Sequence, residues 1–131
     1  MQLLLPLHAV FMVICIAFIV SAVFVAHRRK GNWFAKHKTM GIFGFFAGII
    51  AFLLIFSLKN ILHYPHFKTD HGLFGLATLG ALLLIIGLGV LSSKGVSSLR
   101  KIHLLVSWLV MLVLLGVASV GLLEFINTLH R

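Results

Sequence analysis

Acidic residues are nearly missing from this chain of 131 residues, which has only two, Asp70 and Glu124. Charged residues of either sign make up only 10% of the chain, whereas hydrophobic residues make up 61%. A soluble domain of this size has a large surface relative to its volume and could not present such a composition to water. The composition therefore excludes a soluble domain and indicates an integral membrane protein.

Cysteine occurs once, as Cys15. A single cysteine excludes a disulfide framework, and the chain also has no C-x-x-C-H motif for covalent haem attachment. The net charge is +9, yet we expect no nucleic-acid binding, because no soluble part remains to present a groove. The positive charge instead suggests a membrane topology signal and contact with anionic lipid headgroups.

Four runs without a charged residue are long enough to cross about 30 Å of hydrocarbon, which takes roughly 20 helical residues. They are Leu3–Ala26, Thr39–Leu58, Gly72–Ser93 and Ile102–Leu123. The first has no basic region before it and no small-x-small cleavage site, so we expect a retained helix and not a secretory signal. The runs are continuously apolar, which favours helices over the alternating strands of a β-barrel. We predict an all-α fold, one integral membrane four-helix bundle over residues 1–131, with helices at about 4–26, 37–58, 71–93 and 101–125.

Basic residues predict the orientation. Eight of the eleven lie in the first and third connections, which share one face of the membrane. The positive-inside rule places these connections in the cytoplasm and both termini outside. We expect a bacterial inner membrane.

Histidine is unusually frequent, with eight residues in so apolar a chain. One stands near the start of each predicted helix, as His8, His37, His71 and His103. Successive helices run in opposite directions, so His8 and His71 should meet near one membrane face, and His37 and His103 near the other. Two pairs at two depths would suit two haems with two axial histidines each. The alternative for each histidine is a polar side chain reaching for headgroups.

Glycines follow two of these histidines on the same helical face. Positions 4, 7 and 11 after His37 are Gly41, Gly44 and Gly48, and position 4 after His71 is Gly75. A flat macrocycle could lie against such a stripe, but small residues at this spacing also allow close helix packing in lipid. Cationic residues beside the histidines are candidate partners for haem propionates: Lys36, Lys38, Arg100 and Lys101.

The remaining histidines are weaker candidates. His27 could compete with His37 as a ligand, although it more simply extends to the interface beside Arg28. His63 and His66 form H-x-x-H-x-x-x-x-H with His71, which could bind a surface metal, but a loop offers no fixed geometry. We predict no catalytic residue of another kind.

The order of these motifs resembles the four-helix core of the cytochrome b561 family of transmembrane electron carriers, which has bacterial relatives. The segments that carry the resemblance are "LHAVFMVICIAFIVSAVFVAHRR", "NWFAKHKTMG", "DHGLFGLATLG" and "RKIHLLVSWLV". The resemblance implies two non-covalent haem b groups, one ligated by His8 and His71 and the other by His37 and His103. Ser107 stands where glycine is common in the family, and the flanking helices of animal and plant members are absent.

We therefore expect transmembrane electron transfer, with the haem irons roughly 20 to 25 Å apart. The chain could also be an enzyme, a transmembrane oxidoreductase of the ferric or quinone reductase type. The electron donor and acceptor are open: a quinol, an ascorbate-like reductant, ferric iron or a redox protein. Membrane lipid surrounds the chain, and a homo-oligomer or a redox subunit partner is possible. One alternative is a haem-bearing, quinone-reactive membrane anchor of a redox complex. Another is a haem-free, histidine-lined metal-ion transporter, and a third is a purely structural membrane protein. The predicted helices contain almost no acidic residues, which disfavours a carboxylate proton relay.

Overall fold

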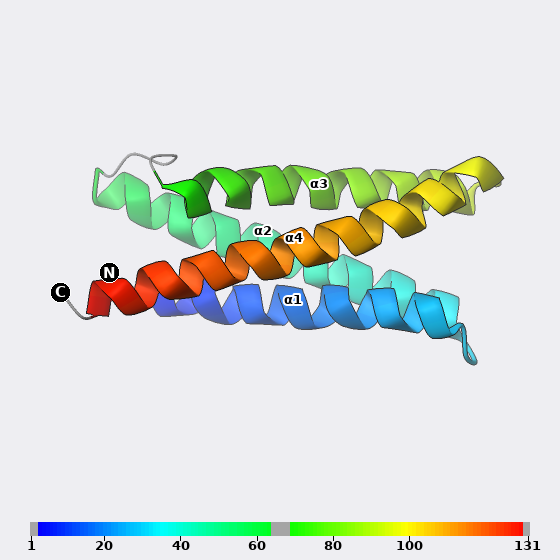
Figure 1. The fold of residues 1–131 in the computed structure, drawn as a ribbon, viewed down its shortest axis with the longest axis horizontal. Helices are drawn as coiled ribbons and strands as arrows, with labels where there is room; N and C mark the ends of the chain where they lie inside the picture. Colours follow the sequence, from blue (N-terminus) through cyan, green and yellow to red (C-terminus); the bar gives the residue numbers. More distant parts are fainter. Residues whose placement is uncertain (1–2, 64–68, 130–131) are drawn as a thin grey trace.

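The computed structural model describes residues 3–63 and 69–129 and contains four long helices joined by short connections (Figure 1). The helices are α1 (Leu4–Arg28), α2 (Trp33–Ile61), α3 (Asp70–Ser93) and α4 (Ser97–Leu129). All four are long and apolar enough to cross a membrane. The prediction of an all-α membrane bundle is thus confirmed.

Two helices begin earlier than predicted, α2 at Trp33 and α4 at Ser97. The prediction followed the charge-free runs, which mark the part of a helix that crosses hydrocarbon and not the helix itself. Lysine and arginine are good helix formers, so α2 extends back through Lys36 and α4 back through Arg100, beyond the apolar band. At α3, the Thr69 side chain accepts a hydrogen bond from the Gly72 amide at 3.2 Å and so caps the start of the helix.

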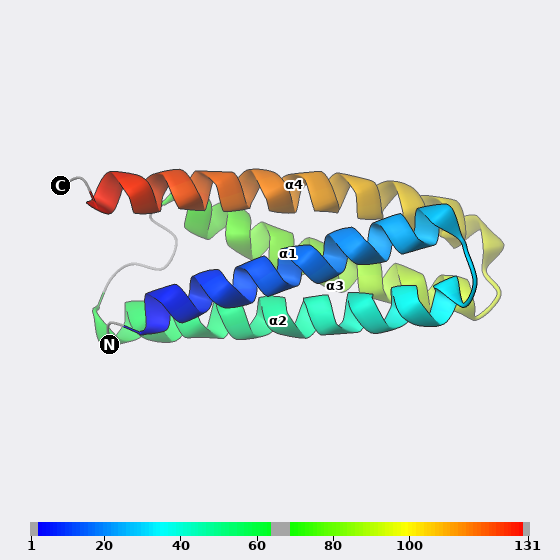
Figure 2. The same cartoon turned by 90° about the horizontal axis from the view of Figure 1, so that it is seen from below.

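The bundle is built from two antiparallel hairpins. α1 packs most extensively on α2, and α3 on α4, while α2–α3 and α1–α4 contacts complete the ring of neighbours. Hence α1 is diagonal to α3, and α2 is diagonal to α4. The α1–α2 and α3–α4 connections lie at one end of the bundle, and both termini lie at the other (Figures 1 and 2). We call the first of these the basic end, since it carries eight of the eleven Lys and Arg residues.

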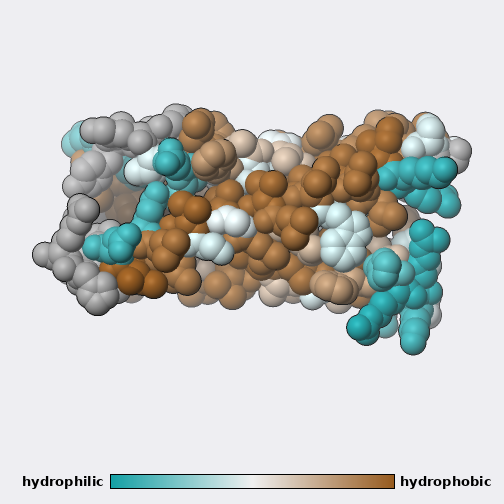
Figure 3. All heavy atoms as spheres, in the orientation of Figure 1, coloured by the Kyte–Doolittle hydropathy of each residue, from teal (hydrophilic) through white to brown (hydrophobic). Residues whose placement is uncertain are grey.

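The core lies midway along the bundle and draws on every helix. Its buried side chains are Cys15, Ile19, Ala47, Leu82, Val110 and Leu114. Most other large apolar side chains face outward in a hydrophobic band, and hydrophilic residues gather at the basic end (Figure 3). This distribution is what a lipid-exposed bundle requires, because lipid covers the outer face.

Close packing of α1 on α2 depends on two glycines. A Cβ atom at Gly44 would lie 2.9 Å from Cδ1 of Ile19, and one at Gly48 would lie 3.2 Å from Sγ of Cys15. Both glycines are buried. They therefore occupy the helix-packing role that the sequence left open as the alternative.

Candidate functional site

Two pairs of histidine rings lie inside the bundle, one pair toward each end. His8 of α1 faces His71 of α3, with ring centroids 6.3 Å apart and ring planes at 86°. His37 of α2 faces His103 of α4, with centroids 5.8 Å apart and planes at 83°. Each pair joins diagonal helices, so the rings meet across the bundle interior. The structure thus brings together the same pairs of histidines that the sequence analysis had placed at one depth in the membrane.

Each of the four imidazoles is fixed by one backbone carbonyl. On the hairpin α1–α2, Nδ1 of His8 lies 2.8 Å from the Ala51 oxygen and Nδ1 of His37 lies 2.9 Å from the Ala22 oxygen. On the hairpin α3–α4, His71 contacts the Val117 oxygen and His103 the Ile85 oxygen, both at 3.1 Å. A carbonyl oxygen can only accept, so each Nδ1 must carry the proton and donate it.

The carbonyl contacts decide which nitrogen remains available. With the proton on Nδ1, a neutral imidazole keeps its lone pair on Nε2. Within residues 3–63 and 69–129, no hydrogen bond to any of the four Nε2 atoms is present. An imidazole anchored through Nδ1–H to a carbonyl, with Nε2 free, is the usual arrangement of a histidine that ligates a metal.

The separations within the pairs fit one metal ion between two axial imidazoles. A metal–nitrogen bond of about 2 Å, with roughly 1 Å more to the ring centre, puts two such rings about 6 Å apart. The observed 6.3 Å and 5.8 Å agree with this value. The chemistry of the donor set also fits haem iron, for which two histidines fill both axial positions.

The four acceptor carbonyls share one spacing from the histidine of their own helix, which the sequence analysis did not identify. In each helix, the residue 14 positions after the histidine supplies the carbonyl for the histidine of its hairpin partner. Fourteen residues are almost four turns, so the histidine and the acceptor lie on one face, about 21 Å apart along the helix. Every helix thus contributes a ligand at one level and an anchor at the other.

Two glycines make room for the rings of the α3–α4 hairpin. A Cβ atom at Gly121 would lie 2.5 Å from Cε1 of His71, and one at Gly89 would lie 3.1 Å from Cε1 of His103. Both glycines stand four residues after an acceptor carbonyl, 18 positions after the histidine of their own helix. The sequence analysis did not identify them, because it followed each histidine along its own first turns and not onto the facing helix.

The other predicted glycines have open space. A Cβ atom at Gly41 or Gly75 would have no heavy atom within 4 Å, apart from the helix itself and its chain neighbours. Gly41 follows His37 by one turn, and Gly75 follows His71 by one turn. These two positions, unlike Gly44 and Gly48, leave a surface free beside the ligand candidates.

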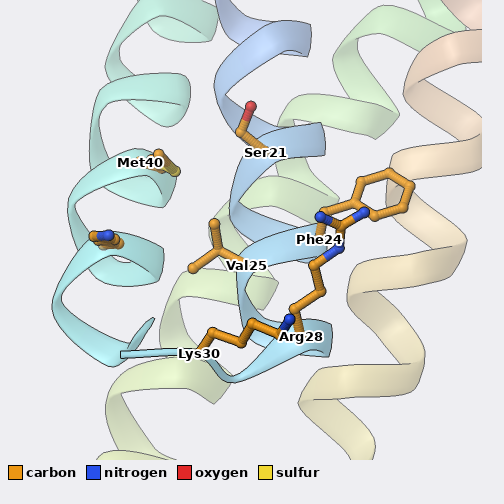
Figure 4. Close-up of a pocket in the computed structure, with 7 residues that line it drawn as sticks. Ser21, Phe24, Val25, Arg28, Lys30 and Met40 are labelled. Atoms are coloured by element: carbon orange, nitrogen blue, oxygen red, sulfur yellow. The ribbon is translucent and has the colours of Figure 1, made fainter. Parts of the chain in front are cut away.

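The predicted cationic partners lie at the basic end. Lys36, Lys38, Arg100 and Lys101 are all exposed. Lys36 lines an open pocket between α1 and α2. Arg28 and Lys30, which line the same pocket, are labelled in Figure 4.

Two of the remaining histidines, His27 and His63, are described, and both are exposed. The ring of His27 packs edge-on against the ring of Trp108, with centroids 6.0 Å apart, and the side chain is exposed. His63 is exposed in the turn after α2, and His66 lies outside the described residues. Across the described part of the chain, no group of three or more metal-ligating side chains of the His, Cys, Asp or Glu type is found.

Four membrane-crossing helices with facing histidines at two levels are the architecture of a b-type membrane cytochrome. The family model described as eukaryotic cytochrome b561 matches residues 7–128. The match spans nearly the whole chain, and the chain therefore belongs to the cytochrome b561 family. Haem b binding and transmembrane electron transfer follow from this membership. Comparisons with curated proteins and with solved structures gave no match.

Proposed function

We propose that the chain holds two haem b groups, one between His8 and His71 and one between His37 and His103, and carries electrons between the two membrane faces. The observation that carries the proposal is the set of four Nδ1-to-carbonyl contacts at 2.8 to 3.1 Å. These contacts leave four Nε2 lone pairs available to bind metal, two at each level.

Bound haem iron supplies one-electron reduction and oxidation, the chemistry on which the transfer depends. The histidines would bind through Nε2, and the backbone carbonyls would hold their rings in one tautomer and one orientation. His8 with His71, and His37 with His103, would each hold one iron, which would then serve electron transfer and not oxygen binding.

Buried apolar side chains lie between the two levels of histidines. The buried core, including Cys15, Leu82 and Leu114, lies between the two pairs. Both pairs and the core belong to the same bundle interior, which supports electron transfer within the bundle if each pair holds a haem. Along the helices, no acidic residue lies between the two levels, since Asp70 precedes His71 and Glu124 follows Val117, whose carbonyl contacts His71.

Cationic side chains at the basic end support propionate binding at that level. Lys38 follows His37 directly, and Arg100 and Lys101 precede His103 in the first turns of α4. Gly41 and Gly75 supply open surface on which a macrocycle could lie. We do not assign Gly44 and Gly48 to haem binding, because they pack against α1. We also do not assign Lys36 to propionate binding, because it lines a separate pocket.

We propose further that the basic end faces the cytoplasm, with both termini on the other side. Electron donor and acceptor are then small molecules or redox proteins that reach the helix ends. Within the described residues, no specific observation favours a quinone-reactive anchor or a haem-free metal-ion transporter.

The test is a reduced-minus-oxidised absorption spectrum of the purified protein with haem quantification. We expect b-type bands and two haems per chain. A colourless protein from haem-replete cells, or one haem at saturation, would contradict the proposal.

A further inference from the structure

A pocket of about 500 Å³ opens between the ends of α1 and α2 near the basic end. From α1 it is lined by Ser21, Phe24, Val25 and Arg28, from the connection by Lys30, and from α2 by Lys36 and Met40 (Figure 4). Positions 21, 25 and 28 recur at helical spacing, as do positions 36 and 40, so each helix gives one continuous stripe to the wall. Neither His37 nor His103 lines the pocket, which is therefore separate from the histidine pair.

The cationic part of this pocket has no acidic counterpart in the protein. Arg28, Lys30 and Lys36 are all exposed. The chain has two acidic residues, and Asp70 and Glu124 both lie toward the opposite end of the bundle, where α3 begins and α4 ends (Figure 1). Three basic side chains line one opening, and no carboxylate side chain of the protein lies near them. They therefore favour binding of an anion from outside the chain.

Toward the middle of the helices the pocket wall is largely apolar, with Ser21 as its polar side chain. Phe24 is 45% exposed, and Val25 and Met40 are half-buried. All three belong to helices that cross the membrane. A water-soluble anion could not use this wall, whereas a molecule with an anionic head and an apolar tail would fill both parts.

We propose that this pocket binds a phospholipid of net negative charge. Its phosphate lies among Arg28, Lys30 and Lys36, and the first part of an acyl chain lies along Phe24, Val25 and Met40. Basic pockets between membrane helices suit such headgroups, because the cations sit at the depth of the phosphates and the apolar wall continues into the hydrocarbon. The site is independent of the haem proposal.

Native mass spectrometry of the purified full-length protein in detergent tests this assignment. Phosphatidylglycerol and phosphatidylcholine with the same acyl chains are titrated separately against the wild type and against Arg28→Gln/Lys30→Gln. We expect the wild type to prefer phosphatidylglycerol and the double variant to bind it about tenfold or more weakly. Equal binding of the two lipids by the wild type, or unchanged phosphatidylglycerol binding by the variant, would overturn the proposal.

A matched control separates a site from general charge. Arg29→Gln/Lys94→Gln removes the same charge, but Arg29 packs over the Trp33 ring at 5.7 Å and neither residue lines the pocket. The control should keep wild-type phosphatidylglycerol binding, and a loss equal to that of the test variant would overturn the proposal. The absorption spectrum of each variant reports its fold and haem content independently.

A soluble anion distinguishes a lipid from its headgroup alone. Glycerol 3-phosphate carries the phosphate without the acyl chains. We expect it not to displace phosphatidylglycerol at equal concentration. Displacement at equal concentration would show that the apolar wall contributes nothing and would overturn the assignment to a lipid.

Discussion

His37 of α2 donates a hydrogen bond from Nδ1 to the carbonyl oxygen of Ala22 on α1, at 2.9 Å. Ala22 stands 14 residues after His8, which itself donates to Ala51, 14 residues after His37. The contact is therefore reciprocal within the hairpin, and the α3–α4 hairpin repeats it with His71 and His103. The four hydrogen bonds between the histidines and the backbone carbonyls therefore require one register between the two helices of each hairpin.

Replacement of Gly121 by alanine should disturb the site at the end opposite the basic end. The new Cβ atom would lie 2.5 Å from Cε1 of His71, so the ring must leave its position or α4 must shift. We expect loss or a spectral shift of one haem and a destabilisation of about 1–3 kcal/mol, as for other overpacked interiors. A reduced-minus-oxidised spectrum and thermal unfolding measure the two effects.

Gly116→Ala is the matched control on the same helix. A Cβ atom there meets no heavy atom within 4 Å, and alanine has the higher helix propensity, so haem content and stability should be retained. Equal spectra from the two variants would contradict the role of Gly121.

Replacement of Gly89 by alanine should produce a milder version of the same effect at the basic end. The nearest atom, Cε1 of His103, would be 3.1 Å from the new Cβ, a distance that a small ring movement can relieve. We expect a shift in the band of the other haem with both haems retained, measured by low-temperature difference spectra. Gly87→Ala, at a position with open space, is the control and should leave the spectrum unchanged.

Gly44→Ala should weaken the α1–α2 packing and not one haem in particular. Its Cβ atom would lie 2.9 Å from Ile19, a buried core residue, and we expect a loss of about 1–3 kcal/mol in stability. A Cβ atom at Gly41 has no such neighbour, so Gly41→Ala should leave the stability of the fold unchanged. Its haem affinity should fall, because the added methyl group would occupy the surface proposed for the macrocycle. Unfolding midpoints and haem retention during dilution separate the two results.

Reporter fusions test the orientation. We expect a reporter at Arg131 to be active on the non-cytoplasmic side and one inserted at Gly95, in the α3–α4 connection, to be active in the cytoplasm. Reversed activities would contradict the proposed topology and leave the histidine pairs unaffected.

Sequence alone predicted the four crossing helices and the grouping of the histidines, because each follows from simple regularities. A charge-free run of 20 residues marks a crossing, and antiparallel neighbours place alternate histidines at one depth. The sequence did not decide the roles of Gly44 and Gly48. A row of small residues on one helical face is compatible with either a macrocycle or a neighbouring helix packed against it. The acceptor carbonyls of Ala22 and Ala51 were also invisible, since any residue offers a carbonyl and only helix register selects which one is used.

Haem quantification in single histidine variants tests the central claim most directly. His37→Ala and His103→Ala should each lose the same one of two haems, and His8→Ala and His71→Ala should each lose the other. The difference spectrum identifies which haem remains, and the haem-to-protein ratio should fall from two to about one. Variants that group in any other way, or that keep both haems, would contradict the pairing on which the account rests.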